Sequence, residues 1–505
     1  MRIEQLELRI YQSIGNALRI HFRLRPIPNY RINGLQVYEP NDYYTVSTNL
    51  KPKYIPRMKC QQLLISRLLP NTRLGYLVSY RGLAYAQRGR KPALPKASEN
   101  ATAIEIPKLM YQYEKAKCGQ LLLPYYSCWA STLLMYTQPL SPRQISDLLF
   151  GLKSVRRDAM EPILSLVSAI SPTTLRCKGL FSKIDIGAAC MGLKNLSSEY
   201  APVRELLTIL TTKITASRDV LNAQASANAL YGLQSMSSEH AEVRILLSAL
   251  AAKIAMTTEP FKGQEIGTAL YGLKGMTSNH AEVRVCVGIL AEKIIGCTDI
   301  LNTQVIGNAL YGLQGMSCEF VEVKAVIKAM ADGIAVSRDT LDAQAIGNLL
   351  YGLQSMSSTS PEVRNLLKTL VPKISHSSDH LTTQHISNAL YGLKNMHSDC
   401  EEVRAILSVI ATKISVCKGT FSAKEMSNAL FGMQGMNDVY VEVRTILKRL
   451  HDKIEMNNIR LDPQGVGMAE YGLKLMIQGS DEVCGLRKWI ESHGKYTKKV
   501  IAKSK

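Results

Sequence analysis

Apolar residues recur every three or four positions through most of the chain, which is the spacing of amphipathic helices. In residues 221–260 two such stripes follow one another, with a polar turn at 237–240 between them and the N-cap residue Asn222 before the first. The pattern predicts a helix A over about 222–236 and a helix B over about 241–255. The stripe of helix A is Ser226, Ala229, Leu230, Leu233 and Met236, and that of helix B is Val243, Leu246, Leu247, Leu250 and Ile254.

The same two-helix pattern repeats along the chain. An aromatic or Met residue, a Gly and a Leu-type residue form a triplet whose Gly falls at 151, 192, 232, 272, 312, 352, 392, 432 and 472. A Glu-Val-Arg or Glu-Val-Lys signature follows about a dozen residues later in most copies, as in 242–244 and 322–324. Two signatures in one register indicate nine tandem copies of a 40-residue helical hairpin.

One hairpin cannot bury both of its apolar stripes, but stacked hairpins can. The Gly of the triplet lies within helix A, where it costs about 1 kcal/mol relative to Ala. Its presence in every copy predicts close backbone contact between neighbouring A helices. We therefore expect an all-α fold, a right-handed α-solenoid of about nine hairpins preceded by an irregular, partly helical N-terminal region.

Four regions follow from these patterns. Residues 1–100 form a basic region rich in Tyr and Arg, and 101–139 form a helical cap or degenerate repeat. Residues 140–490 hold the nine hairpins, and 491–505 form a basic tail. The apolar stretch 121–135 is short and contains Pro124, so we expect buried helices there and no membrane span. Such an array is expected to be monomeric.

The charge is concentrated at the ends of the chain. The net charge is +20, with 20 Lys and Arg against 7 Asp and Glu in residues 1–140, but only 36 against 33 in 141–490. A polyanion is thus a natural partner, with its phosphates contacted mainly by the N-terminal region. The Arg spacing in the first 25 residues is typical of an organelle transit peptide, whereas Glu4 and Glu7 are acids that such peptides avoid.

A repeated polar row lies opposite the core stripe of helix A. A Gln is followed four residues later by Asn and seven residues later by Tyr, so that all three share one side of the helix. Amides can pair with base edges, and aromatic rings can stack on bases. Alternatively, the amides form ladders between helices and the Tyr residues pack between repeats. The candidates are Gln224, Asn228, Tyr231, Gln264, Tyr271, Gln304, Asn308, Tyr311, Gln344, Asn348, Tyr351, Gln384, Asn388, Tyr391 and Asn428.

Two further rows accompany this one. The residue after the Gln varies between copies, as a one-repeat-one-base readout requires, although an unconstrained exposed position would vary in the same way. Its members include Ala225, Glu265, Val305, Ala345, His385 and Glu425. A Lys or Gln row that includes Lys274 and Lys394 could follow a phosphate backbone, or could be a solvated helix edge.

Motifs of catalysis do not occur in the sequence: there is no Gly-rich phosphate loop ending in Lys-Ser or Lys-Thr, no Gly-x-Ser-x-Gly and no His-Glu-x-x-His. We therefore expect no enzyme activity, no cofactor and no metal site. The 11 Cys are scattered without a Cys-x-x-Cys pair, which is typical of reduced thiols in an intracellular or organellar compartment.

The A-helix segments FKGQEIGTALYGLKGM (261–276) and FSAKEMSNALFGMQGM (421–436) resemble the octotricopeptide repeat. In that family an aromatic or Leu residue precedes a polar cap, a Gln and an Asn-Thr-Leu-Trp-Ala-Leu-like core; here Tyr or Phe replaces the Trp, and Gly replaces the following Ala. The resemblance implies sequence-specific binding of single-stranded RNA in a mitochondrion or chloroplast, for stabilisation, processing or translation of transcripts. The alternative is a protein-binding scaffold of armadillo or HEAT type, including a bacterial effector, with a cytoplasmic location.

Overall fold

The computed structural model describes residues 31–32, 35–36, 94–155, 160–477 and 479–503. Contacts divide the chain into two units, Met1–Leu94 and Pro95–Lys505. In the first unit, strands β1 (Arg31–Ile32) and β2 (Leu35–Gln36) pair antiparallel. The expected basic region and transit segment otherwise lie outside the described residues.

The second unit is the expected α-solenoid of nine helical hairpins. It begins with α4 (Glu105–Lys115), the 3-10 helix η2 (Gly119–Tyr125) and α5 (Tyr126–Met135). The A helices are α6 (Pro142–Phe150), α8 (Lys183–Gly192), α10 (Ala223–Tyr231), α12 (Gly263–Tyr271), α14 (Thr303–Gly312), α16 (Ala343–Tyr351), α18 (Thr383–Gly392), α20 (Ala423–Phe431) and α22 (Pro463–Gly472). The B helices are α7 (Met160–Arg176), α9 (Ala201–Ala216), α11 (Ala241–Ala255), α13 (Ala281–Ile295), α15 (Val321–Val336), α17 (Pro361–Ser375), α19 (Glu401–Val416), α21 (Val441–Asn457) and α23 (Asp481–Lys503).

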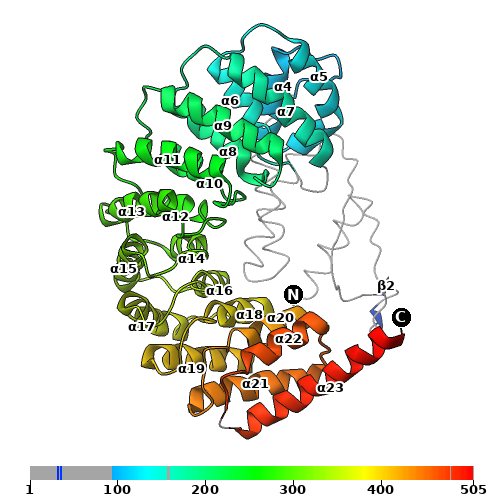
Figure 1. Cartoon of the computed structure of the whole chain (residues 1–505), viewed down its shortest axis with the longest axis vertical. Coiled ribbons are helices and arrows are strands. Elements are labelled where there is room, and N and C mark those ends of the chain that lie inside the picture. Colours follow the sequence, from blue (N-terminus) through cyan, green and yellow to red (C-terminus); the bar gives the residue numbers. More distant parts are fainter. Residues whose placement is uncertain (1–30, 33–34, 37–93, 156–159, 478, 504–505) are drawn as a thin grey trace. The chain divides into compact units, whose positions relative to one another are not determined.

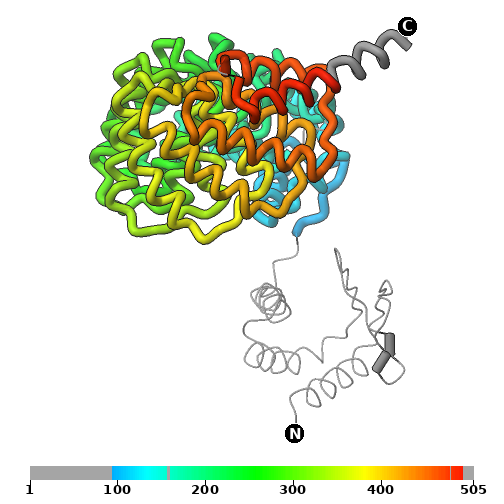
Figure 2. Tube along the Cα trace, turned by 90° about the horizontal axis from the view of Figure 1, so that it is seen from below, coloured from blue at the N-terminus to red at the C-terminus, as the bar shows by residue number. Residues whose placement is uncertain are grey.

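The helices form two rows, because each A helix packs on the next A helix and each B helix on the next B helix. The A helices α10 to α20 lie on the inner side of the curved array and the B helices α11 to α19 on its outer side (Figure 1). Figure 2 shows the hairpins of the array from a second direction, following one another side by side. Helices α4 and α5 pack on α6 and α7, as the two helices of a further repeat would.

The A helices end earlier than the sequence pattern predicts. Helix α10 ends at Tyr231, and the chain then reaches Met236 through three-residue turns, with Leu233 N bonded to Leu230 O and Met236 N to Leu233 O. The apolar periodicity persists through these turns because a 3-10 turn is close in pitch to a helical one. Both Leu233 and Met236 are buried, as predicted.

Capping follows the sequence closely. The side chain of Asn222 accepts a hydrogen bond from Ala225 N at 2.8 Å, and Asn302, Asp342, Thr382, Ser422 and Asp462 cap their helices in the same way. Lys262, the expected exception, contributes no side-chain cap; instead the Glu265 carboxylate accepts a bond from Lys262 N at 2.8 Å.

The triplet Gly makes the predicted close contact. An added Cβ at Gly352 would lie 2.0 Å from the carbonyl oxygen of Leu310 on the preceding A helix, and Gly312 would meet Leu270 in the same way. No side chain fits in this space, so Gly lets the A helices approach each other closely.

The segment from Leu121 to Met135 is buried in part, through Leu122, Tyr126, Trp129 and Leu133. Among the described helices, none has the length and apolar character needed to cross a membrane.

Candidate nucleic-acid interface

The A helices, which form the inner row of the array (Figure 1), carry exposed amide side chains that lie off their core stripe. The Gln in the first turn of each helix is exposed, and the residue four positions later is half-buried. The exposed amides are Gln224, Gln264, Gln304, Gln344 and Gln384; the half-buried residues are Asn228, Thr268, Asn308, Asn348, Asn388 and Asn428.

These amides do not form a ladder between repeats in the part of the chain that the structure describes. Gln264 Nε2 donates to Thr268 Oγ1 at 3.4 Å, a bond within one helix. The amides therefore keep donor and acceptor atoms for an external ligand.

The aromatic residues of the triplet pack between repeats. From Tyr231 through Tyr271, Tyr311, Tyr351, Tyr391 and Phe431 to Tyr471, successive ring centroids are 5.6–5.8 Å apart and the ring planes are inclined by 18–31°. We call these seven rings the aromatic stack. Each contact of this kind contributes roughly 0.5–1.5 kcal/mol beyond burial.

The spacing of the aromatic stack excludes base insertion between repeats. Successive stacked bases rise about 3.4 Å, so a base between two rings would need about 7 Å between their planes. A base could therefore reach a ring with neighbours on both sides only at its edge, and contact of these Tyr residues with bases stays a prediction. Burial, and then the adjacent Tyr residues, raise the pKa of Tyr271 and Tyr311, so their hydroxyls remain protonated donors at neutral pH.

The Lys and Gln row borders the aromatic stack. Lys274 Nζ lies 4.6 Å from the ring centroid of Tyr271, and Lys394 Nζ lies 4.5 Å from that of Tyr391. Both ammonium groups also lie near the hydroxyl of the same Tyr, at 3.3 and 3.4 Å. Between them, Gln354 Nε2 donates to Gln314 Oε1 at 3.2 Å, and Lys394 Nζ donates to Gln354 Oε1 at 3.3 Å. The row is thus a continuous polar edge that holds cations above aromatic rings.

The variable position does not behave as a readout row. Ala225, Val305 and Ala345 are only 7%, 2% and 4% exposed, so they have almost no surface for a ligand. They face the preceding repeat: an added Cβ at Gly307 would lie 3.1 Å from Ala345 Cα. The prediction that these residues read bases is wrong, because this side of helix A faces a neighbouring repeat rather than solvent.

The polar members of that position serve the start of their own helices. The carboxylate of Glu425 accepts bonds from Ser422 N and Oγ, both at 2.8 Å. Glu265 caps helix α12 in the same way, and His385 Nδ1 lies 3.4 Å from Thr382 N. Burial lowers the pKa of His385, which favours its neutral, bond-accepting form. Variation at this position therefore reflects alternative ways of closing a helix N-terminus.

Carboxylates from the following loop also occupy the A-helix N-termini. Lys183 N donates to Asp219 Oδ2 at 2.9 Å, and Gly263 N to Asp299 Oδ2 at 3.1 Å. Ala343 N donates to Asp379 in the same manner. A phosphate is disfavoured where the helix N-terminus already binds an acidic side chain.

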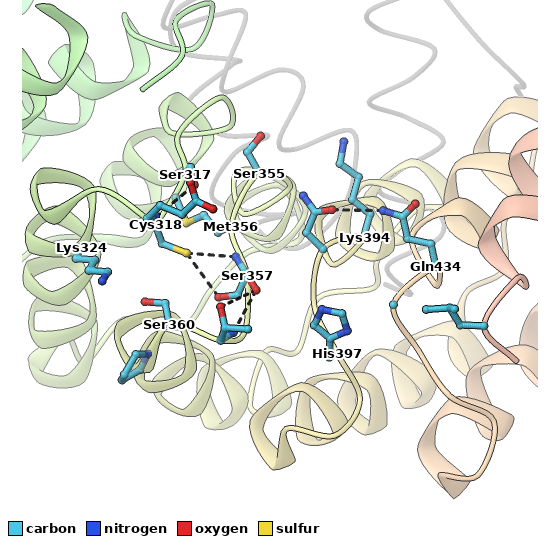
Figure 3. A pocket seen from close by; sticks show the side chains of 16 residues that line it. Ser317, Cys318, Lys324, Ser355, Met356, Ser357, Ser360, Lys394, His397 and Gln434 are labelled. Carbon is cyan, nitrogen blue, oxygen red and sulfur yellow. Dashed lines mark hydrogen bonds between the residues drawn. The ribbon is translucent and has the colours of Figure 1, made fainter. Parts of the chain in front are cut away.

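A polar cavity of about 590 Å³ opens beside the A-to-B turns of several successive repeats (Figure 3). Lys394, Gln434 and His397 contribute to its wall, and the Cys318 thiol contacts the backbone of Ser357 there. Cys318 occupies a position that is Ser in the neighbouring repeats, as in Ser278 and Ser358. This position links successive repeats: Ser358 Oγ accepts a bond from His397 N of the next repeat at 2.9 Å. The cavity extends the Lys and Gln row into a groove with hydrogen-bonding and cationic walls.

The Arg residues of helix B are structural, because they pair with Glu residues of the next repeat. Arg204 Nε lies 3.7 Å from Glu242 Oε1 of the next repeat, and Arg244 lies at the same distance from Glu282. The sequence did not reveal their stronger contacts: Arg244 Nη1 donates to the carbonyl oxygens of Ser238 and Glu239, at 2.7 and 3.0 Å, within its own A-to-B turn.

In the described part of the chain, no group of three or more His, Cys, Asp or Glu is placed to hold a metal ion. Burial raises the pKa of the Cys190 and Cys286 thiols to about 12. Such thiols are poor nucleophiles at neutral pH.

Neither a protein-family model nor a curated protein matches this chain. Among solved structures, yeast Rmd9p in complex with a 16-nucleotide target RNA is similar, with 12% sequence identity and a TM-score of 0.27. The match covers 89% of this chain and 93% of the yeast chain. The assignment of the fold as an α-solenoid follows from the helices themselves.

Proposed function

We propose that this chain is a non-catalytic RNA-binding repeat protein that holds single-stranded RNA along the inner side of its A helices. The observation that carries the proposal is the set of amides at a 40-residue period that no neighbouring repeat uses. An amide offers a donor and an acceptor side by side, which matches the edges of unpaired bases. The octotricopeptide resemblance leads to the same function.

The surroundings of the amides support a polyanionic ligand. Lys274 and Lys394 lie in the turns that follow α12 and α18, over the Tyr rings of the same repeats as the amides. The near-neutral array would then supply specificity, while the basic residues of 1–140 supply most of the non-specific attraction. With one repeat per nucleotide, nine repeats would contact about nine bases. We further propose that the RNA is an organellar transcript that binding stabilises, processes or makes translatable.

The proposal is tested first by crosslinking the full chain to RNA in cells and sequencing the bound fragments. The recovered RNA is then titrated against a variant with Gln304, Asn308, Gln344 and Asn348 changed to Ala. Each good amide–base pair contributes about 1–3 kcal/mol, so the affinity is expected to fall at least tenfold. Asn365→Ala, an exposed amide on outer helix α17, is the control and should leave binding unchanged.

Equal RNA affinity in the wild type and the four-residue variant, with both folded, would show that the amides do not contact the RNA. Loss of binding to the same extent in Asn365→Ala would show that the measurement reports general surface polarity rather than the amide row.

A protein-binding scaffold is the second candidate, and one observation favours it. The outer B helices expose apolar side chains, including Ile245 at 57% and Val285 at 56% at equivalent positions of neighbouring repeats. Exposed apolar side chains in register can form part of a protein interface. Recovery of a specific protein in place of RNA, lost in Ile245→Ser with Val285→Ser, would select this function.

A further inference from the structure

The aromatic stack ends at Tyr471, and this ring differs from the others. Its ring centroid lies 5.6 Å from that of Phe431, but no aromatic ring covers its second side in the described part of the chain. Tyr471 is 52% exposed, whereas Tyr391 and the other Tyr residues of the aromatic stack are half-buried. One face of Tyr471 is therefore open to a planar partner.

The surface around Tyr471 is not a closed terminal cap. A terminal repeat normally presents a polar outer face, but the turn after α22 exposes Leu475 at 51% and Ile477 at 76%. An added Cβ at Gly467 would meet nothing within 4 Å, whereas one at the equivalent Gly347 would contact His385 at 3.3 Å. None of the described residues thus covers the outer side of α22 at Gly467.

The opposite end of the aromatic stack, at Tyr231, differs from Tyr471 in its neighbours and in its exposure. The row position before Tyr231 is Met191, and Lys194 Nζ lies 5.9 Å from the centroid of the Tyr231 ring. Tyr231 is half-buried. Among the described residues, the aromatic stack therefore has one open aromatic end, at Tyr471.

We propose that the open face of Tyr471 stacks on a nucleobase of the bound RNA, as the terminal platform of the interface. This inference rests on the proposed function and adds a site to it. A base on Tyr471 would continue the aromatic stack beyond its last described ring, without the separation of rings that interior insertion would require. Lys474 Nζ lies 5.8 Å from the Tyr471 centroid, where an ammonium group can contact the phosphate of that nucleotide.

The test uses the full chain and the RNA recovered from it, with 2-aminopurine placed at each position in turn. Stacking quenches this fluorescent base, so one end position of the site should be quenched by the wild type and by Tyr471→Trp but released in Tyr471→Ala. Tyr471→Ala should bind about 5- to 150-fold more weakly, the range found when a base-stacking ring is replaced by Ala. Ile477→Ala, a nearby exposed apolar residue, should bind as the wild type does.

The outcomes separate this inference from the function beneath it. If the wild type binds no RNA, both fail. If the wild type binds and Tyr471→Ala binds equally well with unchanged quenching, the platform alone is refuted. If Tyr471→Ala instead dissolves a self-associated form, with RNA binding unchanged, the open face is a contact between two copies of the chain and the nucleobase assignment is overturned.

Discussion

Replacing Gly352 with Ala should destabilise the array, although the backbone at this position suits any residue. Gly352 has φ −60° and ψ −20°, ordinary right-handed helical values. The added Cβ would lie 2.0 Å from the Leu310 carbonyl oxygen and 2.4 Å from the carbonyl carbon. Because backbone atoms cannot swing aside as a flexible side chain can, α16 would have to move about 1 Å away from α14 to restore an ordinary contact.

The magnitude follows from what this movement disturbs. Overpacking of this kind costs about 1–3 kcal/mol. The movement also strains the stacking of Tyr351 on Tyr311, whose centroids are 5.6 Å apart, and an aromatic pair contributes about 0.5–1.5 kcal/mol. The helix propensity of Ala returns at most about 1 kcal/mol. The net effect is a loss of roughly 1–3 kcal/mol, opposite in sign to a Gly-to-Ala change at an unobstructed helix position.

Urea unfolding followed by circular dichroism measures the effect, with transition midpoints compared directly because a repeat array need not unfold in two states. Gly467→Ala is the matched control: it lies inside α22, and its Cβ would meet nothing within 4 Å. It should raise the midpoint or leave it unchanged. The reasoning is refuted if Gly352→Ala is as stable as the wild type, or if the two variants lose stability equally.

Two other predictions concern single side chains. Arg404→Lys should lower the free energy of unfolding by about 1–2 kcal/mol, because it removes the bonds from Nη1 to the Ser398 and Asp399 carbonyl oxygens at 2.7 and 3.0 Å. Lys324→Arg, at the same position of another repeat, should raise it. An unchanged urea midpoint in both variants would contradict a stabilising role for this Arg. Cys190 and Cys286 should resist a thiol-disulfide reagent at pH 8 while the chain is folded. Burial raises the pKa of both thiols to about 12, above the ordinary value of about 8.5. Because the unfolded chain therefore loses these protons at lower pH than the folded chain, the free energy of unfolding should fall as pH rises between those values. Rapid labelling of the folded chain would contradict the burial.

The repeat unit was predictable because each of its main features has a local physical cause that recurs at one period. The core stripes, the N-cap side chains and the Gly contact each require a particular residue type, and the structure confirms all three. The expected exception at Lys262 was also found. Because the pattern occurs in nine copies, a substitution that obscures it in one helix is offset by the other copies.

The face assignments were only partly predictable, because a solenoid helix has three kinds of surroundings. One side faces the core of its own repeat, one faces solvent, and the others face the preceding and following repeats. A hydrophobic stripe marks only the first. Ala225 and Gln224 are adjacent in sequence and both lie off the stripe, yet one is 7% exposed and the other is exposed. The distinction depends on how far apart successive helices lie, which the sequence of one repeat does not encode.

The direct contact between A helices also restricts which RNA sequences the array could distinguish. Close approach stacks the aromatic rings and buries Ala225, Val305 and Ala345, so in the proposed function ligand contact falls to the exposed Gln and the Asn that follows it. From α10 to α20 these two positions vary little: Gln recurs in α10, α12, α14, α16 and α18, and Asn in α10, α14, α16, α18 and α20, with Thr268 in α12 and Lys424 in α20 as the departures. The first two A helices differ at both positions, with Arg143 and Asp147 in α6 and Ile184 and Ala188 in α8, and α22 has Met468 at the second. Like side chains in like positions select like bases. If the proposed function holds, the part of the target that α10 to α20 contact is therefore a run of low sequence diversity. Competition between single-base runs and a mixed sequence of equal length should then favour one run by at least tenfold. A mixed nine-base site that outcompetes every run would show instead that residues other than the amides distinguish the bases.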